Sequence, residues 1–415
     1  MRQVVWLLLL FAVAVLAAST LGANDGLVSI YWSPWRIDLS FNVFVILLLA
    51  VGAIAHVVTG AVASLIDLPQ RARQWRLQQR EQAAQKSLRE AFSLLFAGRY
   101  GRAHKAAQQA LDIQAQTPGL RIEPDFAVLA HLVAAGSLHR LQDQARRDEQ
   151  LARAQALIAD MPSGTTVGEG ARMLAAEWAV DDRDADRALD QLALLPAGVA
   201  RRTHALRLKL QATRLARQPL EALKTARLLA KHQGFTPIAA RGLLRSLAAE
   251  AIEDCHDLHQ LQRLWQQLDA ADRADASVAA RAAARAGRLG SNADAREWLR
   301  PFWDRLGELD RDDREAVALA LFDAAPGIEH EWLPRLEAAL EAHGHDSAVV
   351  AAVGMAFADR QLWGKARKLL EQSAAAGTLP LRARRRAWRA LAQMAREAGD
   401  DARAQDCERA AAALE

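Results

Sequence analysis

The sequence has little cysteine, little tyrosine and almost no excess of charge of either sign. Its 415 residues include two cysteines and two tyrosines, and 53 lysines and arginines face 49 aspartates and glutamates. Cys255 and Cys407 lie far apart, without CxxC spacing. This excludes a disulfide framework, a structural zinc site and an iron–sulfur cluster. A net charge of +4 is too small to indicate a nucleic-acid partner.

Alanine and leucine supply most of the apolar residues. Hydrophobic residues make up 51% of the chain, but aromatic residues only 6%. Alanine and leucine favour helix, whereas strands favour β-branched and aromatic residues. The composition therefore predicts an all-α fold.

Two long apolar runs lie near the N-terminus, over residues 4–21 and about 39–66. Each is long enough to cross a bilayer as a helix. Arg71, Arg73 and Arg76 follow the second run, and positive charge favours the cytoplasmic side. We therefore expect residues 1–66 to form a transmembrane hairpin with both termini in the cytoplasm. The small residues 16–19 also suit a signal peptidase, so cleavage of the first span stays open.

Aromatic residues precede the second span, one histidine lies within it, and a basic segment follows it. Tyr31, Trp32 and Trp35 suit the interfacial aromatic belt. His56 lies inside the span, where it is either a ligand for haem or a neutral histidine, on a small polar helix face with Thr59 or near the headgroups because the span is long. The sequence at 67–69 contains Pro69 and predicts a break, followed by a basic juxtamembrane helix over 67–90.

From residue 87 to 415, helix-forming segments alternate with short breaks containing glycine or proline. This pattern indicates an array of helical hairpins of the tetratricopeptide type, in which small and large residues alternate where two helices cross. The alternative is a plain helical domain without a groove. The repeat-packing positions that we assign are Gly98, Tyr100, Ala103, Gly290, Ala295, Gly354, Phe357, Trp363, Ala366, Leu370, Trp388, Gly399 and Ala404.

No catalytic motif emerges from the sequence. Neither a GxGxxG, a GxSxG nor an HExxH pattern occurs, so we assign no catalytic residue and no metal site. Cys255 and His259 would share one helix face, but two ligands do not make a site. The glycines at 164–170 suggest a loop between helices. The charged runs at 181–184 and 310–314 suggest solvated surfaces and helix N-termini.

Two further clusters have ordinary interpretations beside functional ones. His343 and His345 flank Gly344 in an expected turn between helices. The basic run at 382–389 suits a solvated helix face, or a surface for an acidic partner or for the carboxylates of a porphyrin.

Specific motifs resemble a known family. NDGLV at 24–28 and WRIDLS at 35–40 lie between the expected spans, and QLWGKAR at 361–367 lies near the C-terminus. These three segments are similar to the proteobacterial HemY family of inner-membrane tetratricopeptide proteins. The resemblance places a HemY-type N-terminal region at about 26–134. The unrelated flavin-dependent oxidase of the same name needs a dinucleotide fingerprint that this sequence lacks.

Taken with the helical array, the resemblance leads us to expect a membrane scaffold that gathers tetrapyrrole-pathway enzymes by protein contacts. The resemblance itself implies a cytoplasmic-membrane protein associated with late steps of protohaem synthesis. It implies no catalytic residues and no bound cofactor. One alternative is a protein that binds haem or porphyrin, or an enzyme of the pathway, using His56 or the basic run at 382–389. Another is a membrane adaptor in envelope biogenesis.

Overall fold

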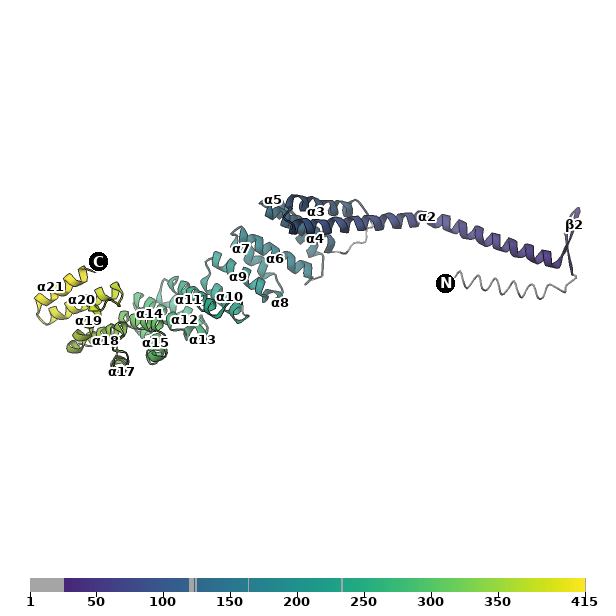
Figure 1. Ribbon diagram of the computed structural model, residues 1–415. Helices are drawn as coiled ribbons and strands as arrows, with labels where there is room; N and C mark the ends of the chain where they lie inside the picture. The colour runs from purple at the N-terminus through teal and green to yellow at the C-terminus, as the bar shows by residue number, and fades with distance from the viewer. Residues whose placement is uncertain (1–25, 119–122, 124, 163, 233, 415) are drawn as a thin grey trace. The chain divides into compact units, whose positions relative to one another are not determined.

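A computed structural model describes residues 26–118, 123, 125–162, 164–232 and 234–414 (Figure 1). The chain divides into two compact units, Met1–Leu157 and Ile158–Glu415. Apart from one two-stranded ribbon, the regular elements among these residues are all helical. The expected first span at 4–21 lies outside the described residues.

The ribbon corrects the expectation of an entirely helical chain. Strands β1 (Leu27–Trp32) and β2 (Trp35–Ser40) pair antiparallel around a turn at Ser33 and Pro34. The sequence of β2, WRIDLS, alternates apolar and polar residues, and both strands contain the β-branched and aromatic residues that strands favour. The local pattern therefore outweighs the helical bias of the overall composition.

Helix α2 (Phe41–Phe96) is continuous for 56 residues, and the break predicted at Pro69 is wrong. An interior proline removes one backbone hydrogen bond, but strong helix formers on both sides keep the backbone helical. The segment expected as a separate juxtamembrane helix, residues 67–90, is thus part of α2 and lies almost wholly in its second half. Its first part, Phe41–Ala61, is long and apolar enough to cross a membrane.

The first unit continues with three helices of 16 residues each: α3 (Tyr100–Ala115), α4 (Asp125–Arg140) and α5 (Gln144–Ala159). The C-terminal part of α2 packs against α3 and α4. Small residues such as Ala91, Ala107 and Ala130 are fully buried between them, with Phe126 and Val133 filling the space around them. Residues 87–96 of α2 therefore supply the first helix of this helical packing.

The second unit is a succession of helices joined by short turns. Its helices are α6 (Thr166–Asp181), α7 (Ala185–Ala193), α8 (Ala197–Ala200), α9 (Thr203–Leu215), α10 (Pro219–Lys231), α11 (Pro237–Glu253), α12 (Leu258–Gln267), α13 (Ala270–Arg273), α14 (Ala276–Arg288), α15 (Asn292–Trp303), η1 (Leu306–Glu308), α16 (Arg311–Asp323), η2 (His330–Trp332), α17 (Leu333–His343), α18 (Ser347–Asp359), α19 (Trp363–Ala375), α20 (Leu381–Glu397) and α21 (Asp401–Ala412).

Alternate helices of this unit form a layer. Helices α11, α14, α16, α18 and α20 each contact the next in that order, and α15, α17, α19 and α21 pack beside them. Links recur about one helix pair apart: the Gln262 amide bonds Asp294, and the Trp303 indole N–H donates to the carbonyl of Arg335, across 32 residues in both cases. The unit therefore repeats a two-helix element along the chain.

Candidate functional site

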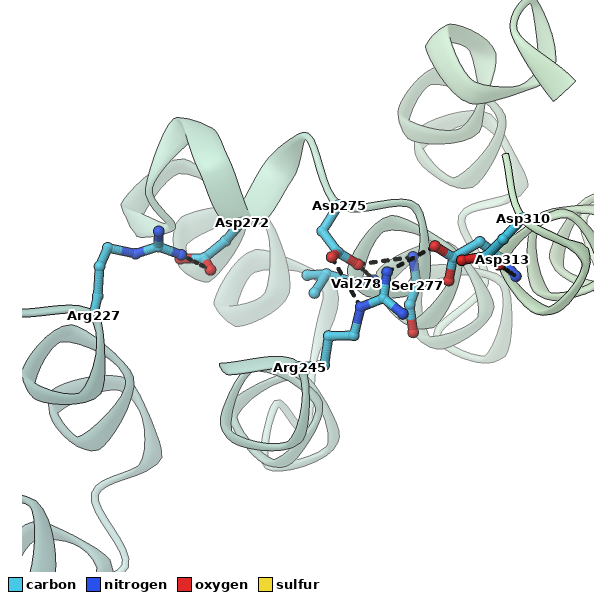
Figure 2. Close-up of polar contacts among 8 residues, drawn as sticks. All are labelled: Arg227, Arg245, Asp272, Asp275, Ser277, Val278, Asp310 and Asp313. Atoms are coloured by element: carbon cyan, nitrogen blue, oxygen red, sulfur yellow. Dashed lines mark hydrogen bonds and ion pairs between the residues drawn. The ribbon is translucent and has the colours of Figure 1, made fainter. Parts of the chain in front are cut away.

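Arg245 connects three consecutive helices of the layer (Figure 2). It extends from α11, and its Nε donates to Asp275 Oδ2 at 2.9 Å, while a terminal nitrogen donates to Asp313 Oδ2 at 2.7 Å. Asp275 caps the N-terminus of α14, and its other oxygen accepts from the backbone N–H groups of Ser277 and Val278 at 3.0 and 3.3 Å. One guanidinium therefore joins α11, α14 and α16.

The charges of this cluster support one another. Burial alone lowers the pKa of Arg245, but its hydrogen bonds to Asp313 and Asp275 outweigh burial and hold that pKa above its ordinary value. A similar ion pair lies nearby (Figure 2), where Arg227 of α10 contacts the buried carboxylate of Asp272 in α13. Both arginines fix neighbouring helices to each other.

A groove of about 620 Å³ surrounds Arg245, between the end of α9 and the exposed sides of α11 and α14. Three exposed arginines line it, Arg214, Arg217 and Arg281. Within the described part of the chain, their side chains make no hydrogen bond or ion pair. The groove also contains the carboxylates of Glu250 and Glu253, and Glu253 is already bound by Arg288, which lies outside the groove, at 2.6 Å. Three available guanidinium groups make the groove suitable for carboxylates or phosphates.

A second cavity, of about 510 Å³, has a different chemistry. It lies between α7, α8, α9 and α10, and leucine and alanine side chains form most of its wall, including Leu189, Leu192 and Leu228. Arg201 and Lys209 are its two cationic residues. This cavity suits an apolar ligand that carries negative groups.

The structure does not gather the residues considered for metal or haem binding. His56 lies in the candidate span of α2, on an exposed part of the helix. Cys255 is buried in the loop after α11, whereas His259 lies on α12, so the expectation that they share a helix face is wrong. Asp257 ends the loop by capping α12 through Gln260 N at 2.8 Å. Among the described residues, no three metal-ligating side chains lie together.

The basic run in α20 is engaged within the fold. Arg386 forms an ion pair with Asp323 of α16, and Arg382 lies 3.8 Å from the same carboxylate. Arg384 Nε donates to the carbonyl of Ala374 at 2.9 Å. Much of the positive charge considered for an external partner therefore joins α20 to α16 and α19.

The structure confirms one expected turn and differs from the expected loop at 164–170 and from the expected solvated surface at 310–314. His343 ends α17 and His345 follows it in the turn, as expected, with 6.3 Å between the ring centres. Of the clustered glycines, Gly164 lies in a loop, but residues 168 and 170 lie inside α6, because Thr165 caps that helix early. Asp313 is buried rather than solvated, because it bonds Arg245.

The assigned repeat-packing residues fall into three structural groups. Three glycines occupy turns with positive φ: Gly98, Gly290 and Gly399. Seven residues are buried within helices: Ala103, Ala295, Gly354, Phe357, Ala366, Leu370 and Ala404. The three remaining aromatic residues are half-buried: Tyr100, Trp363 and Trp388. At the contact between α18 and α19, a Cβ added at Gly354 would lie 3.0 Å from Leu370 Cγ.

Residues 26–142 match the family model described as HemY protein N-terminus. The chain carries a HemY N-terminal domain. The match confirms the family resemblance seen in residues 24–40. The HemY domain spans the ribbon, all of α2, and helices α3 and α4. No curated protein matches the chain.

The residues that line the groove around Arg245 and the leucine-rich cavity were not recognisable as sites from the sequence. Arg245 and Arg281 belong to different helices, and their common groove arises only when α11 and α14 pack together. A local signal was present, because Arg214 and Arg217, which both line the groove, lie three residues apart at and just after the end of α9. In an arginine-rich chain that spacing does not distinguish a groove from a solvated helix face.

Proposed function

We propose that this HemY-domain protein is an inner-membrane scaffold for late steps of protohaem synthesis. In this proposal a two-span hairpin anchors it, and a cytoplasmic array of tetratricopeptide-type helix pairs binds enzymes of the tetrapyrrole pathway. The observation that carries the proposal is which structural elements the HemY domain contains. It unites a candidate membrane span, Phe41–Ala61, with the first packed helices of the first unit.

The groove around Arg245 is the binding surface that we assign to a partner enzyme. Helical layers of this kind offer extended surfaces that bind polypeptides without catalytic residues. Arg214, Arg217 and Arg281 present donors to side-chain or C-terminal carboxylates, while Glu250 accepts from a partner's N–H groups. This mixed lining favours an extended polypeptide that carries acidic residues.

The test is affinity capture of the full-length protein from its own membranes after mild cross-linking, with mass spectrometry of the bound proteins. The groove variant carries Arg214→Glu, Arg217→Glu and Arg281→Glu. A control variant reverses the same number of exposed charges outside the groove, at Arg207, Arg263 and Arg273.

We expect wild type and the control to enrich tetrapyrrole-pathway enzymes over an unrelated membrane protein, and the groove variant to lose them. A deletion strain should accumulate porphyrins, and the control should restore haem where the groove variant does not. Enrichment of envelope-assembly proteins with a normal porphyrin profile would refute the haem assignment. Equal capture by both variants would refute the groove.

A second candidate function is binding of a tetrapyrrole in the apolar cavity of α7–α10. A tetrapyrrole is a flat apolar ring with carboxylates at its edge, and the cavity combines a leucine-rich wall with Arg201 and Lys209. Titration of the full-length protein with haem should give a shifted Soret band. Replacing Arg201 or Lys209 by alanine should then weaken binding about tenfold, since a charge-assisted hydrogen bond contributes about 1.5 kcal/mol. A titration without a Soret shift, or with one that the His56→Ala variant alone removes, would exclude this cavity.

A further inference from the structure

The ribbon in front of α2 has two chemically different faces. Residues directly opposite each other in an antiparallel pair share a face, and successive residues alternate between faces. The register therefore places three wholly apolar pairs on one face: Val28 with Leu39, Ile30 with Ile37, and Trp32 with Trp35. The other face carries Ser29 with Asp38, Tyr31 with Arg36, and Leu27 with Ser40.

The polar face is satisfied by its own residues. Ser29 donates to the carboxylate of Asp38, and Arg36 Nε donates to the same carboxylate at 3.0 Å. Those two hydrogen bonds hold the pKa of Asp38 below its ordinary value. The guanidinium of Arg36 also lies over the ring of Tyr31, 5.4 Å from its centre. Its charged and polar groups favour contact between this face and water.

The apolar face has no such partners within the described residues. Trp32 and Trp35, at the tip, are 76% and 73% exposed, and Ile37 is 50% exposed. Tyr31 is 73% exposed as well, but it lies on the polar face. The register thus separates Tyr31 from the two tryptophans with which it was expected to form one aromatic belt.

The ribbon joins the candidate span without a linker. Ser40, the last residue of β2, caps α2 by accepting from Val43 N at 3.4 Å. Phe41 N also donates to the carbonyl of Gly26, at the start of β1, at 2.8 Å. Both ends of the ribbon are therefore fixed to the first turn of α2, where the apolar stretch Phe41–Ala61 begins.

We propose that the apolar face of the ribbon lies in the headgroup–acyl boundary of the bilayer, at the membrane surface where α2 enters. Tryptophan is enriched at this depth because its ring is apolar and its N–H is polar. Amphipathic elements lie along the boundary with their apolar side inward. The ribbon acts as a lateral anchor that fixes the rotation and depth of α2. The inference rests on α2 spanning the membrane, as in the proposed function.

The test places a single cysteine on each face and labels it with the polarity-sensitive fluorophore NBD. The pairs are Trp32→Cys against Tyr31→Cys, and Ile37→Cys against Arg36→Cys, which keeps both tryptophans. Members of a pair are sequence neighbours on opposite faces. The native Cys255 and Cys407 label slowly, since both are buried and burial raises the pKa of each thiol. Ile54→Cys, in the middle of the span, reports whether α2 is in lipid.

Full-length protein in phosphatidylcholine–phosphatidylglycerol vesicles is compared with lipids that carry a nitroxide near the headgroup. We expect labels at 32 and 37 to emit at shorter wavelength and to be quenched severalfold more by these lipids than labels at 31 and 36. Iodide in the buffer should quench in the opposite order. Equal behaviour within both pairs would refute the proposal.

Three other outcomes would overturn it in distinguishable ways. Protection at 32 without lipid quenching would mean that protein covers the face. A disulfide between copies at residue 32, lost on dilution in lipid, would identify that protein as a second copy of the chain. A label at 54 that emits as in water would instead remove the membrane span, and with it the proposed anchoring.

Discussion

The contact between α18 and α19 allows a sharp test of how this array is packed. Gly354 is buried in α18, and a Cβ there would lie 3.0 and 3.1 Å from two carbons of Leu370 and 3.2 Å from Cβ of Leu369. These distances are shorter than ordinary carbon contacts. Gly354→Ala therefore forces α18 and α19 apart, and such overpacking costs about 1–3 kcal/mol.

The same substitution also stabilises the helix. Alanine in a helix interior is favoured over glycine by about 1 kcal/mol. Gly242, in the interior of α11, supplies the matched control, since nothing lies within 4 Å of a Cβ added there. Gly242→Ala receives the propensity gain alone, and Gly354→Ala receives it together with the clash. The difference between the two variants isolates a packing cost of about 1–3 kcal/mol.

The measurement is hydrogen exchange with mass spectrometry on the full-length protein, which reports local opening free energies. Relative to the change that Gly242→Ala produces in α11, peptides of α18 and α19 in Gly354→Ala should exchange about 5- to 150-fold faster. Adding Leu370→Met should recover part of the protection, because the flexible thioether yields to the new methyl group. Equal protection in the two alanine variants would show that α18 and α19 are not in close contact at Gly354.

Further predictions concern charged and titratable groups. Arg147 is almost fully buried and contacts Nδ1 of the buried His139 at 3.1 Å, so Arg147→Ala should cost about 1–3 kcal/mol and speed exchange in α4 and α5 but not in α18. Burial lowers the pKa of His104 and His131, so on acidification these histidines take up protons in the unfolded chain before they do so in the folded protein. Their contribution to stability is complete above the ordinary histidine pKa of about 6.5 and should be lost as the pH falls below that value. Hydrogen exchange in the first unit, compared at about pH 7.5 and pH 5.5, measures this loss. Arg245→Met should destabilise α14 and α16 by about 2 kcal/mol in urea-dependent exchange, because it leaves Asp313 buried without its cation; an unchanged α16 would contradict that role.

Turns were the part of the fold that the sequence predicted best. The glycines at 98, 290 and 399 all adopt positive φ, a conformation that glycine reaches readily because it has no Cβ. The helical character of residues 87–414 likewise follows from composition and from breaks that are visible in the sequence. These features depend on a few neighbouring residues, so one sequence is enough to infer them.

The predictions of local structure were wrong where one preference of the sequence was applied without the preference that opposes it. Pro69 disfavours helix, but the helix formers on either side of it decide the conformation. At Cys255 and His259, even spacing suggested one helix face, yet the cap at Asp257 starts a new helix between them. The ribbon was missed because a window of 14 residues is short beside the apolar runs that flank it.

The charged residues of the second unit show why the candidate groove lies beyond such reasoning. Asp275 and Asp346 cap α14 and α18, and each also receives an arginine from an earlier helix, Arg245 and Arg314 respectively. In both cases one carboxylate starts a helix and fixes it to a neighbour 30 or 32 residues away. These ion pairs neutralise charges that the sequence alone would assign to the surface. The arginines that indicate a binding groove are therefore those that form no ion pair with the residues that the structure describes. Arg281 is such a residue, and it projects from the same layer into the groove.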